Sequence, residues 1–303
     1  MHASLKKVII TGGSGFLGHH LVGHLKKHGY DVVVIDRVPS RHEGVETVIA
    51  NLMEHIPSDE RLAHPYAYIH LAGKNIFGRF TKKHKYEIHA SRTVGTRNLV
   101  QFLKNKRYAP RVLVSASAVG FYGERGDELL NESSDQGQGF LSEVVSDWEH
   151  EVLQARFFDM RTAIFRQGHI MGTGGFLGAL VPSFQKGLGG PIGKGTQWLP
   201  WIHIHDVVNF YREALENDTI EGIYNMTSKT PTRYSDMSRA LARALGRPHW
   251  IRIPRWLLAF AFGKEFAREM TVSQRIISHR LADFHYETQW NNITACIDNL
   301  YGS

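Results

Sequence analysis

The sequence is poor in features that would place the protein in an oxidising compartment or in a membrane. It contains one cysteine, Cys296, so a disulfide within the chain is excluded. Its longest apolar run, residues 256–263, is far too short to cross a bilayer. The N-terminus runs directly into a predicted strand, and we see no signal peptide ahead of it. These absences predict a cytoplasmic protein without a membrane partner.

Charge and composition limit which classes of ligand are expected. The chain of 303 residues carries 36 Lys and Arg against 29 Asp and Glu, a formal net charge of +7. That excess favours an anionic partner. We see no basic run interleaved with aromatic residues, as RNA-binding modules have, so no nucleic acid is expected. The charge alone does not choose between nucleic acid, anionic lipid and a phosphate-bearing small molecule; we expect a small-molecule substrate, and the oligomeric state is left open.

Apolar, β-branched runs alternate with helical periodicity through the first 171 residues. Strands are predicted at 7–11, 31–37, 45–52, 67–73 and 160–172, with a fifth strand that runs into a loop within 110–123, and helices at 15–29, 84–106 and 143–158. This alternation predicts an α/β fold, a Rossmann-like doubly wound parallel sheet. Residues 172–303 are glycine-rich at first and then mainly helical. We expect them to form a smaller mixed C-terminal lobe, with strands near 202–228 returning to the main sheet.

A glycine-rich loop separates the first predicted strand from the first predicted helix. Gly12, Gly15 and Gly18 have the spacing G-x-x-G-x-x-G. Glycines at these positions permit a tight turn, close approach of a pyrophosphate, and close packing of helix on strand. Asp36 ends the second strand, where an acidic residue can accept hydrogen bonds from an adenosine ribose. The loop predicts that residues 1–171 bind a dinucleotide and that residues 172–303 bind the substrate.

Several longer motifs point to a family. TGGSGFLG, IHLAG, SASAVGFYG and WIHIHDVV resemble the extended short-chain dehydrogenase/reductase superfamily, the fold of nucleotide-sugar epimerases. Within it, GLGGPIGKGTQWLPWIHIHD, SDWEHEV and SQRIISHRL resemble the YfcH and SDR39U1-like epimerase family. The resemblance covers essentially the whole chain. It implies an NAD(P)-binding oxidoreductase or epimerase, whose substrate in this family is generally unassigned.

The resemblance also implies which residues surround the cofactor. Those expected around the pyrophosphate, the ribose and the adenine are Gly12, Ser14, Gly15, Phe16, Leu17, Asp36, Arg37, Asn51 and Leu52. Those expected along the cofactor floor, in the cleft and near the nicotinamide are Leu71, Ala72, Gly73, Glu87, Arg92, Ser115 and Ser117. We further expect Glu87 and Arg92 to form an ion pair that positions the cofactor.

Two adjacent residues argue for different cofactors. Asp36 would repel a 2′-phosphate and favours NAD, whereas Arg37 could pair with that phosphate in a bidentate manner. The family resemblance, like Arg37, favours NADP. From Asp36 we lean towards NAD.

The usual catalytic pair of the superfamily is missing. No tyrosine is followed by lysine four residues later, and Phe140 and Val144 occupy the expected positions. Phenylalanine has no exchangeable proton and valine has no charge, so this pair cannot exchange a proton as Tyr and Lys do. Ser117 and Tyr122 are the substitute catalytic candidates, although a packed core aromatic is the more expected role of Tyr122. Glu87 could act as a base, and His169 is expected to be a buried neutral histidine.

Two other chemistries are disfavoured. His203, His205 and Asp206 suggest a metal site, but no third ligand with helical spacing follows and H-E-x-x-H is absent, so no metal is expected. On a strand His203 and His205 would share one face, and a hydrogen-bonding role at the strand end is the expected alternative. Ser115 and Ser117 are not in G-x-S-x-G, which disfavours a hydrolase.

Two functions remain open. One is an NAD(P)-dependent oxidoreductase or epimerase with a non-standard proton donor, which acts on a small molecule such as a nucleotide sugar. The other is a non-enzymatic NAD(P)-binding redox sensor, which the missing pair favours.

Overall fold

The computed structural model describes residues 5–283 and 286–302. A central parallel sheet has seven strands in the order β11-β7-β5-β4-β1-β2-β3. Its strands are β1 (Lys7–Thr11), β2 (Asp31–Asp36), β3 (Glu46–Ile49), β4 (Ala67–His70), β5 (Val112–Ala118), β7 (Arg161–Gln167) and β11 (Gly222–Met226). The Rossmann-like doubly wound fold is therefore confirmed.

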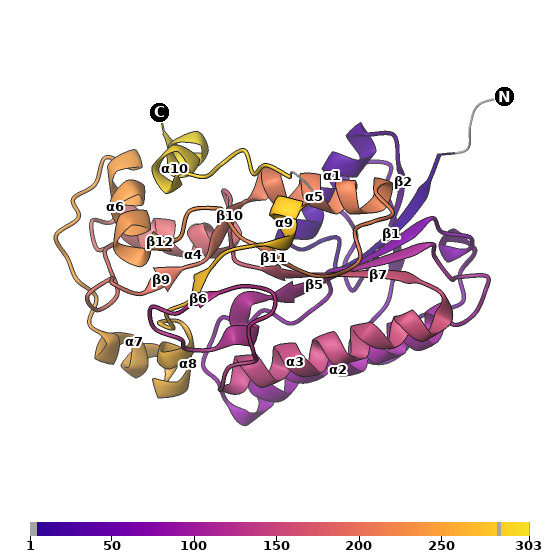
Figure 1. Ribbon diagram of the computed structural model, residues 1–303, viewed down its shortest axis with the longest axis horizontal. Helices are drawn as coiled ribbons and strands as arrows, with labels where there is room; N and C mark the ends of the chain where they lie inside the picture. Colours follow the sequence, from indigo (N-terminus) through magenta and orange to yellow (C-terminus); the bar gives the residue numbers. More distant parts are fainter. Residues whose placement is uncertain (1–4, 284–285, 303) are drawn as a thin grey trace.

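Helices cover both faces of this sheet (Figure 1). One face carries α1 (Phe16–Lys27) and α5 (Ile204–Glu216), and the other carries α2 (Lys82–Leu103) and α3 (Phe140–Leu153). Each face has its own apolar core, because the central strands are buried on both sides. Short 3-10 turns complete this part, at η1 (Glu60–Leu62), η2 (Val119–Tyr122) and η3 (Gln154–Phe158).

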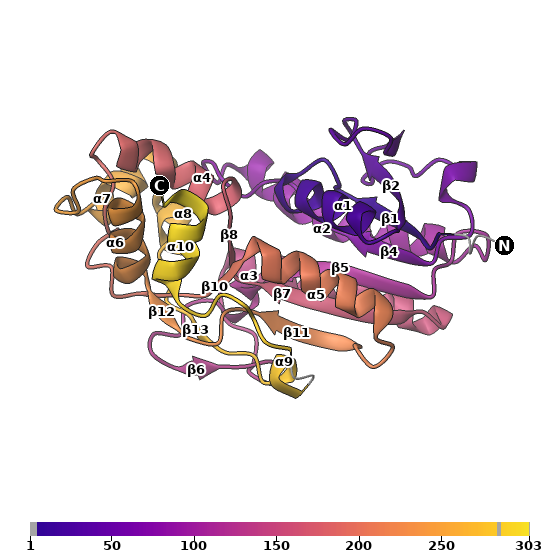
Figure 2. The ribbon, with the colours of Figure 1, turned by 90° about the horizontal axis from the view of Figure 1, so that it is seen from above.

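The second lobe lies at the carboxyl end of the sheet (Figure 2). Its helices are α4 (Gly175–Gln185), α6 (Tyr234–Ala244), α7 (Arg255–Phe262), α8 (Lys264–Glu269), α9 (Arg280–Asp283) and α10 (Ile293–Tyr301). Three small two-stranded sheets pair β8 (His169–Met171) with β10 (Trp201–His203), β9 (Trp198–Leu199) with β12 (Thr232–Arg233), and β6 (Leu129–Leu130) with β13 (Arg275–Ile276). A separate core around Trp201, Tyr234 and Ile297 holds this lobe together.

The strand order has its switch point between β1 and β4. The chain proceeds from β1 outward to β2 and β3, and then returns to β4 on the other side of β1. In open α/β sheets, ligands bind in the crevice that such a reversal opens at the carboxyl ends of the strands. Of the segments expected to return to the sheet, β11 does so, whereas β10 pairs with β8 outside it. The division of the chain at residues 171 and 172 stays a prediction.

Candidate functional site

The glycine loop closes tightly between β1 and α1. Gly12 has a φ of +74°, a left-handed conformation, and a Cβ there would lie 2.8 Å from the backbone nitrogen of Ala72. A Cβ on Gly18 would lie 2.4 Å from the carbonyl oxygen of Gly12, so only glycine lets α1 sit this close to the loop. Gly15 caps the helix with extended backbone and no side-chain hydrogen bond. The first N–H groups of α1 thus have no side-chain cap within this turn.

A cavity of about 520 Å³ opens beside this loop, and we call it the loop cavity. Fifteen residues are predicted to bind the cofactor when Ser117 is counted with the catalytic candidates, and the cavity brings together eleven of them: Gly12, Ser14, Gly15, Asp36, Arg37, Asn51, Leu52, Leu71, Ala72, Gly73 and Glu87. These residues follow the carboxyl ends of four strands, β1, β2, β3 and β4, or lie on α2. Their contact with a dinucleotide stays a prediction.

Asp36 ties the second strand to the glycine loop. One oxygen of its carboxylate accepts a hydrogen bond from the backbone N–H of Ser14 at 3.0 Å, and the other accepts from the N–H of Arg37 at 2.7 Å. The hydroxyl of Ser14 in turn donates to the carbonyl of Val38. The Arg37 residue itself is exposed at the edge of the loop cavity. Asp36 therefore stabilises the glycine loop through these hydrogen bonds, whichever cofactor is bound.

Four predicted cofactor residues do not line the loop cavity. A Cβ on Gly172, Gly174 or Gly175 would lie 2.7–2.8 Å from the ring of Phe16, so this ring packs closely on the second lobe. Leu17 packs against the core under α1. Ser115 is fully buried in β5, and its hydroxyl donates to the carbonyl of Ala116. Arg92 is the fourth.

The expected ion pair between Glu87 and Arg92 is wrong. Glu87 pairs instead with Lys74, with 2.8 Å between Oε2 and Nζ, at the edge of the loop cavity. Arg92 donates to the carbonyls of Lys74 and Ile88, and burial lowers the pKa of its guanidinium to about 10. A Cβ on Gly73 would lie 3.3 Å from Cζ of Arg92. Arg92 thus remains positively charged at neutral pH directly behind the cavity wall.

Ser117 and Tyr122, the predicted catalytic residues, both belong to a buried polar network. Ser117 donates to Glu149 at 2.5 Å, and Glu149 accepts two hydrogen bonds from Arg166 at 2.8 Å each. Arg166 also donates to the hydroxyl of Tyr122, which itself donates to Asn225 at 2.7 Å. All five residues are at most 4% exposed. Burial raises the pKa of Tyr122. A catalytic role for Ser117 or Tyr122 stays a prediction, and this packing favours the core role weighed for Tyr122.

The positions of the missing catalytic pair are apolar in three dimensions as well. Phe140 begins α3, and its ring contacts the ring of Phe80 at a centroid distance of 5.5 Å. The ammonium of Lys85 lies 4.5 Å from the centre of the Phe140 ring. Val144, one turn further, is 1% exposed. Neither position presents a group that can exchange a proton.

A larger cavity of about 930 Å³, the lobe cavity, lies between the loop before α3 and the second lobe. Four arginines from separate segments line it: Arg125, Arg233, Arg255 and Arg268. Glu269 also lines it and is 8% exposed. Burial raises the pKa of Glu269. Two contacts oppose that shift: the charge of Arg268, and a hydrogen bond that the backbone N–H of Phe140 donates to the carboxylate. Sequence reasoning missed Glu269, because its place at the start of α3 depends on tertiary contact.

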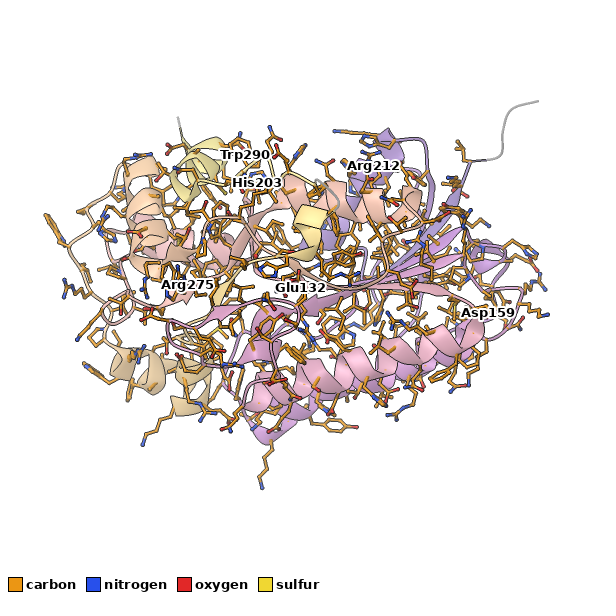
Figure 3. All side chains as sticks on the ribbon, in the orientation of Figure 1. Glu132, Asp159, His203, Arg212, Arg275 and Trp290 are labelled. Atoms are coloured by element: carbon orange, nitrogen blue, oxygen red, sulfur yellow. The ribbon has the colours of Figure 1, made fainter. Side chains whose placement is uncertain are left out.

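The histidine motif near residue 203 is structural. His203 ends β10 and caps α5, because its Nδ1 accepts the N–H of His205 at 3.1 Å. The prediction that His203 and His205 share a strand face is wrong, since α5 begins at Ile204. The rings of His203 and Trp290 lie 4.9 Å apart between centroids, tilted by 33°, and Figure 3 labels the two residues in the same region. Asp206 accepts backbone hydrogen bonds from Gln289 and Trp290.

Metal ligation finds no support in the described part of the chain, where no group of three or more His, Cys, Asp or Glu side chains is arranged to hold an ion. His169 is half-buried in β8, and desolvation lowers its pKa to about 4, so it is the neutral histidine expected from the sequence.

Comparison with known proteins decides the family. The model of the NAD dependent epimerase/dehydratase family matches residues 8–227. This chain belongs to that family. The resemblance to SDR39U1-like proteins is also confirmed, since the chain is 34% identical to the chloroplastic SDR39U1 homolog of Arabidopsis thaliana, over 94% of this chain and 84% of the homolog.

Further relatives cover the chain from end to end. It is 36% identical to the epimerase family protein YfhF of Bacillus subtilis, over 97% of each chain. Human SDR39U1, solved with NADPH, superposes with a TM-score of 0.86 at 27% identity, over 97% of this chain and 99% of that one. A nucleoside-diphosphate sugar epimerase from Corynebacterium glutamicum superposes with a TM-score of 0.79 at 30% identity, over 99% of this chain and 59% of that one.

Proposed function

We propose that this epimerase-family protein binds NADP(H) in the loop cavity and acts as an oxidoreductase or epimerase on a nucleotide sugar held in the lobe cavity. The observation that carries the proposal is the convergence of eleven predicted cofactor residues on one cavity at the uncapped start of α1. A helix start of this kind binds phosphate groups, because its N–H groups and its dipole both favour negative charge.

The residues present fit a dinucleotide. A side chain at Gly12 would collide with the backbone of Ala72, so only glycine lets the loop pack this closely on the segment after β4. The volume of about 520 Å³ lies within the range of small-molecule sites. When bound, a nicotinamide cofactor supplies the hydride chemistry. The chain itself would hold the diphosphate with the N–H groups in the first turn of α1, because those of Gly12, Ser14 and Gly15 already donate to Ile35, Asp36 and Gly12. The charge of Arg92 behind Gly73 would add to the local positive potential.

We propose NADP(H) rather than NAD(H), although Asp36 alone favours the opposite. One oxygen of Asp36 accepts the N–H of Ser14 in the glycine loop and the other accepts the N–H of Arg37, and these two bonds offset part of the carboxylate's charge. Arg37 is exposed beside it and is suited to a 2′-phosphate. The NADPH in the human SDR39U1 structure, at 27% identity, points the same way.

Calorimetric titration with NADPH and NADH tests this preference. We expect tighter binding of NADPH, and we expect Arg37→Ala to weaken it roughly tenfold or more, because a charge-assisted contact contributes about 1.5–3 kcal/mol. Binding of NADH should change little. Arg41→Ala is the matched control, since Arg41 is equally exposed but does not line the loop cavity. Equal affinities of the two cofactors, unchanged in Arg37→Ala, would overturn the preference.

The lobe cavity supplies the argument for the substrate. Four arginines line this cavity against three acidic residues, Glu124, Asp127 and Glu269, so its lining has a small net positive charge. Arg125 and Arg233 pair with Glu128 and Asp127, which leaves Arg255 and Arg268 as the arginines best suited to a phosphate group. The name of the Corynebacterium protein, a nucleoside-diphosphate sugar epimerase at 30% identity, supports the same class. We propose Glu269 as the proton-transferring residue, because it is a buried carboxyl facing this cavity beside the position of the missing pair.

An activity panel tests the chemical half of the proposal. Purified protein with NADPH or NADP⁺ is mixed with nucleotide sugars and their keto forms, and cofactor absorbance and sugar products are followed. We expect turnover by the wild type and a loss of at least about a hundredfold in Glu269→Gln, the scale of general acid–base catalysis. Cofactor affinity should be unchanged. Full activity of Glu269→Gln would remove that residue from the chemistry.

One observation favours a second function, a non-enzymatic NAD(P)-binding redox sensor. The hydroxyls of Ser117 and Tyr122 are engaged in the buried network, and Phe140 and Val144 are apolar. Tight cofactor binding with no turnover on a broad panel would favour the sensor over the enzyme.

A further inference from the structure

An apolar patch interrupts the surface of the second lobe at α7, and the core does not use it. Trp256 is 69% exposed and Phe260 is 77% exposed, and they lie four residues apart on one side of the helix. Leu257 on the same side is 44% exposed, whereas Leu258 packs inward on the core of the lobe. Trp250, on the segment that leads into α7, is 78% exposed. We call Trp250, Trp256, Leu257 and Phe260 the α7 patch.

The segment that carries the α7 patch has charge of only one sign. Residues 247–264 contain Arg247, Arg252, Arg255 and Lys264, and no aspartate or glutamate. The next acidic residue, Glu265, is engaged by the ammonium of Lys85 at 2.6 Å. Exposed aromatic rings flanked by cations are the pattern of helices that lie in the headgroup region of anionic membranes.

The same charges argue against a second copy of this chain as the occupant. In a two-fold dimer each patch would face its own copy, so Arg252, Arg255 and Lys264 would approach like charges with no acid in the segment to balance them. An anionic lipid surface meets both features, because headgroups pair with the cations and the rings enter the boundary of the acyl chains.

The position of α7 in the fold suits a flat partner. The segment between α6 and α7 and the helix itself form one end of the molecule, at the left in Figure 1, away from the central sheet. The guanidinium of Arg79 donates to the carbonyl of Phe260, and the ring of Phe262 lies on Phe266, so α7 is anchored on its inner side. No helix among residues 5–283 and 286–302 could span a bilayer, so the contact would be peripheral.

We propose that the α7 patch docks this protein on an anionic lipid surface. Arg255 begins α7 and also lines the lobe cavity, so docking would bring the mouth of that cavity towards the membrane. This inference is independent of the proposed function, because it needs neither the cofactor nor turnover.

Co-sedimentation with phosphatidylcholine vesicles, with and without phosphatidylglycerol, tests the proposal on the full chain. We expect binding to the anionic vesicles, a blue shift of tryptophan emission, and release at high salt. Arg252→Gln/Lys264→Gln should weaken binding about 25-fold, since each cation near such a surface contributes about fivefold. Trp256→Ser/Phe260→Ser should abolish the blue shift and most of the binding.

Phe157→Ser is the matched control, because Phe157 is 78% exposed on η3, away from α7. All variants change exposed side chains, and thermal melting checks that each one folds. Three results would overturn the proposal: no binding to anionic vesicles, equal losses in Phe157→Ser and Trp256→Ser/Phe260→Ser, or wild-type dimers in vesicle-free buffer that Trp256→Ser/Phe260→Ser dissociates. The last result would assign the patch to self-association.

Discussion

Removal of Arg166 should destabilise the protein more than removal of any surface arginine. The Arg166 and Glu149 side chains are 3% and 6% exposed and share two hydrogen bonds of 2.8 Å. In Arg166→Met, Glu149 would stay buried with the hydroxyl of Ser117 as its remaining partner in this network. Breaking a buried ion pair on one side costs about 3–5 kcal/mol, because an uncompensated charge is left in the core.

Thermal and urea unfolding measure this loss. For a chain of this size, about 3–5 kcal/mol corresponds to a fall in melting temperature on the order of 6–10 °C. The double variant Glu149→Met/Arg166→Met should recover much of the loss, because an apolar pair of similar volume needs no charge compensation. Arg239→Met is the control, since Arg239 and Asp236 form an exposed pair with 68% and 50% side-chain exposure. That change should cost less than about 1 kcal/mol.

Two results would refute the reasoning about this pair. If Arg166→Met lost no more stability than Arg239→Met, the pair would be solvated or dispensable in solution. If the double variant were as unstable as Arg166→Met, the loss would come from the shape or other contacts of Arg166 rather than from a stranded charge. The cation of Arg166 also lies 3.5 Å from the centre of the Phe121 ring, which is the contact to examine in that case.

Three further outcomes follow from buried groups. Burial lowers the pKa values of His70 and His203 from 6.5 to about 4, so the unfolded chain takes up protons at these residues before the folded chain does. The free energy of unfolding should be full above pH 6.5 and fall by about 1.4 kcal/mol per histidine per pH unit towards pH 4. Equal stabilities in urea unfolding at pH 7.5 and pH 5.5 would contradict this. Gly18→Ala should destabilise by about 1–3 kcal/mol, because its Cβ would lie 2.4 Å from the oxygen of Gly12; an unchanged melting temperature would show that the loop can open. Cys296 is fully buried, and burial raises the pKa of its thiol to about 12. A thiol reagent should therefore label Cys296 only after denaturation, and rapid labelling of the native protein would contradict this packing.

The strands and the loop were predictable because local pattern determines them. The apolar run before Gly12 is β1, and the run that ends at Asp36 is β2, both within one residue of the prediction. Strands buried on both faces read as continuous apolar runs, and a glycine loop between strand and helix is specific in spacing. The loop cavity followed from the same pattern, since its residues lie at the carboxyl ends of consecutive strands.

The rest depends on contacts between distant segments. Glu149 and Arg166 come from a helix and a strand whose patterns do not reveal that the two charges meet in the core. Lys74 was missed as the partner of Glu87, because a lysine in a loop has no pattern that fixes its direction. Glu269 reaches the start of α3 only through the packing of the second lobe.

Dinucleotide binding at the loop cavity is tested most directly by calorimetry on two proteins. Ala72 lines the loop cavity, and Ala72→Trp adds a bulky side chain at that position. We predict saturable binding of NADPH to the wild type, with a higher melting temperature in its presence, and loss of both effects in folded Ala72→Trp. Wild-type protein that shows neither heat nor a melting shift with NADPH or NADH, or Ala72→Trp that binds as the wild type does, would contradict the assignment of this cavity.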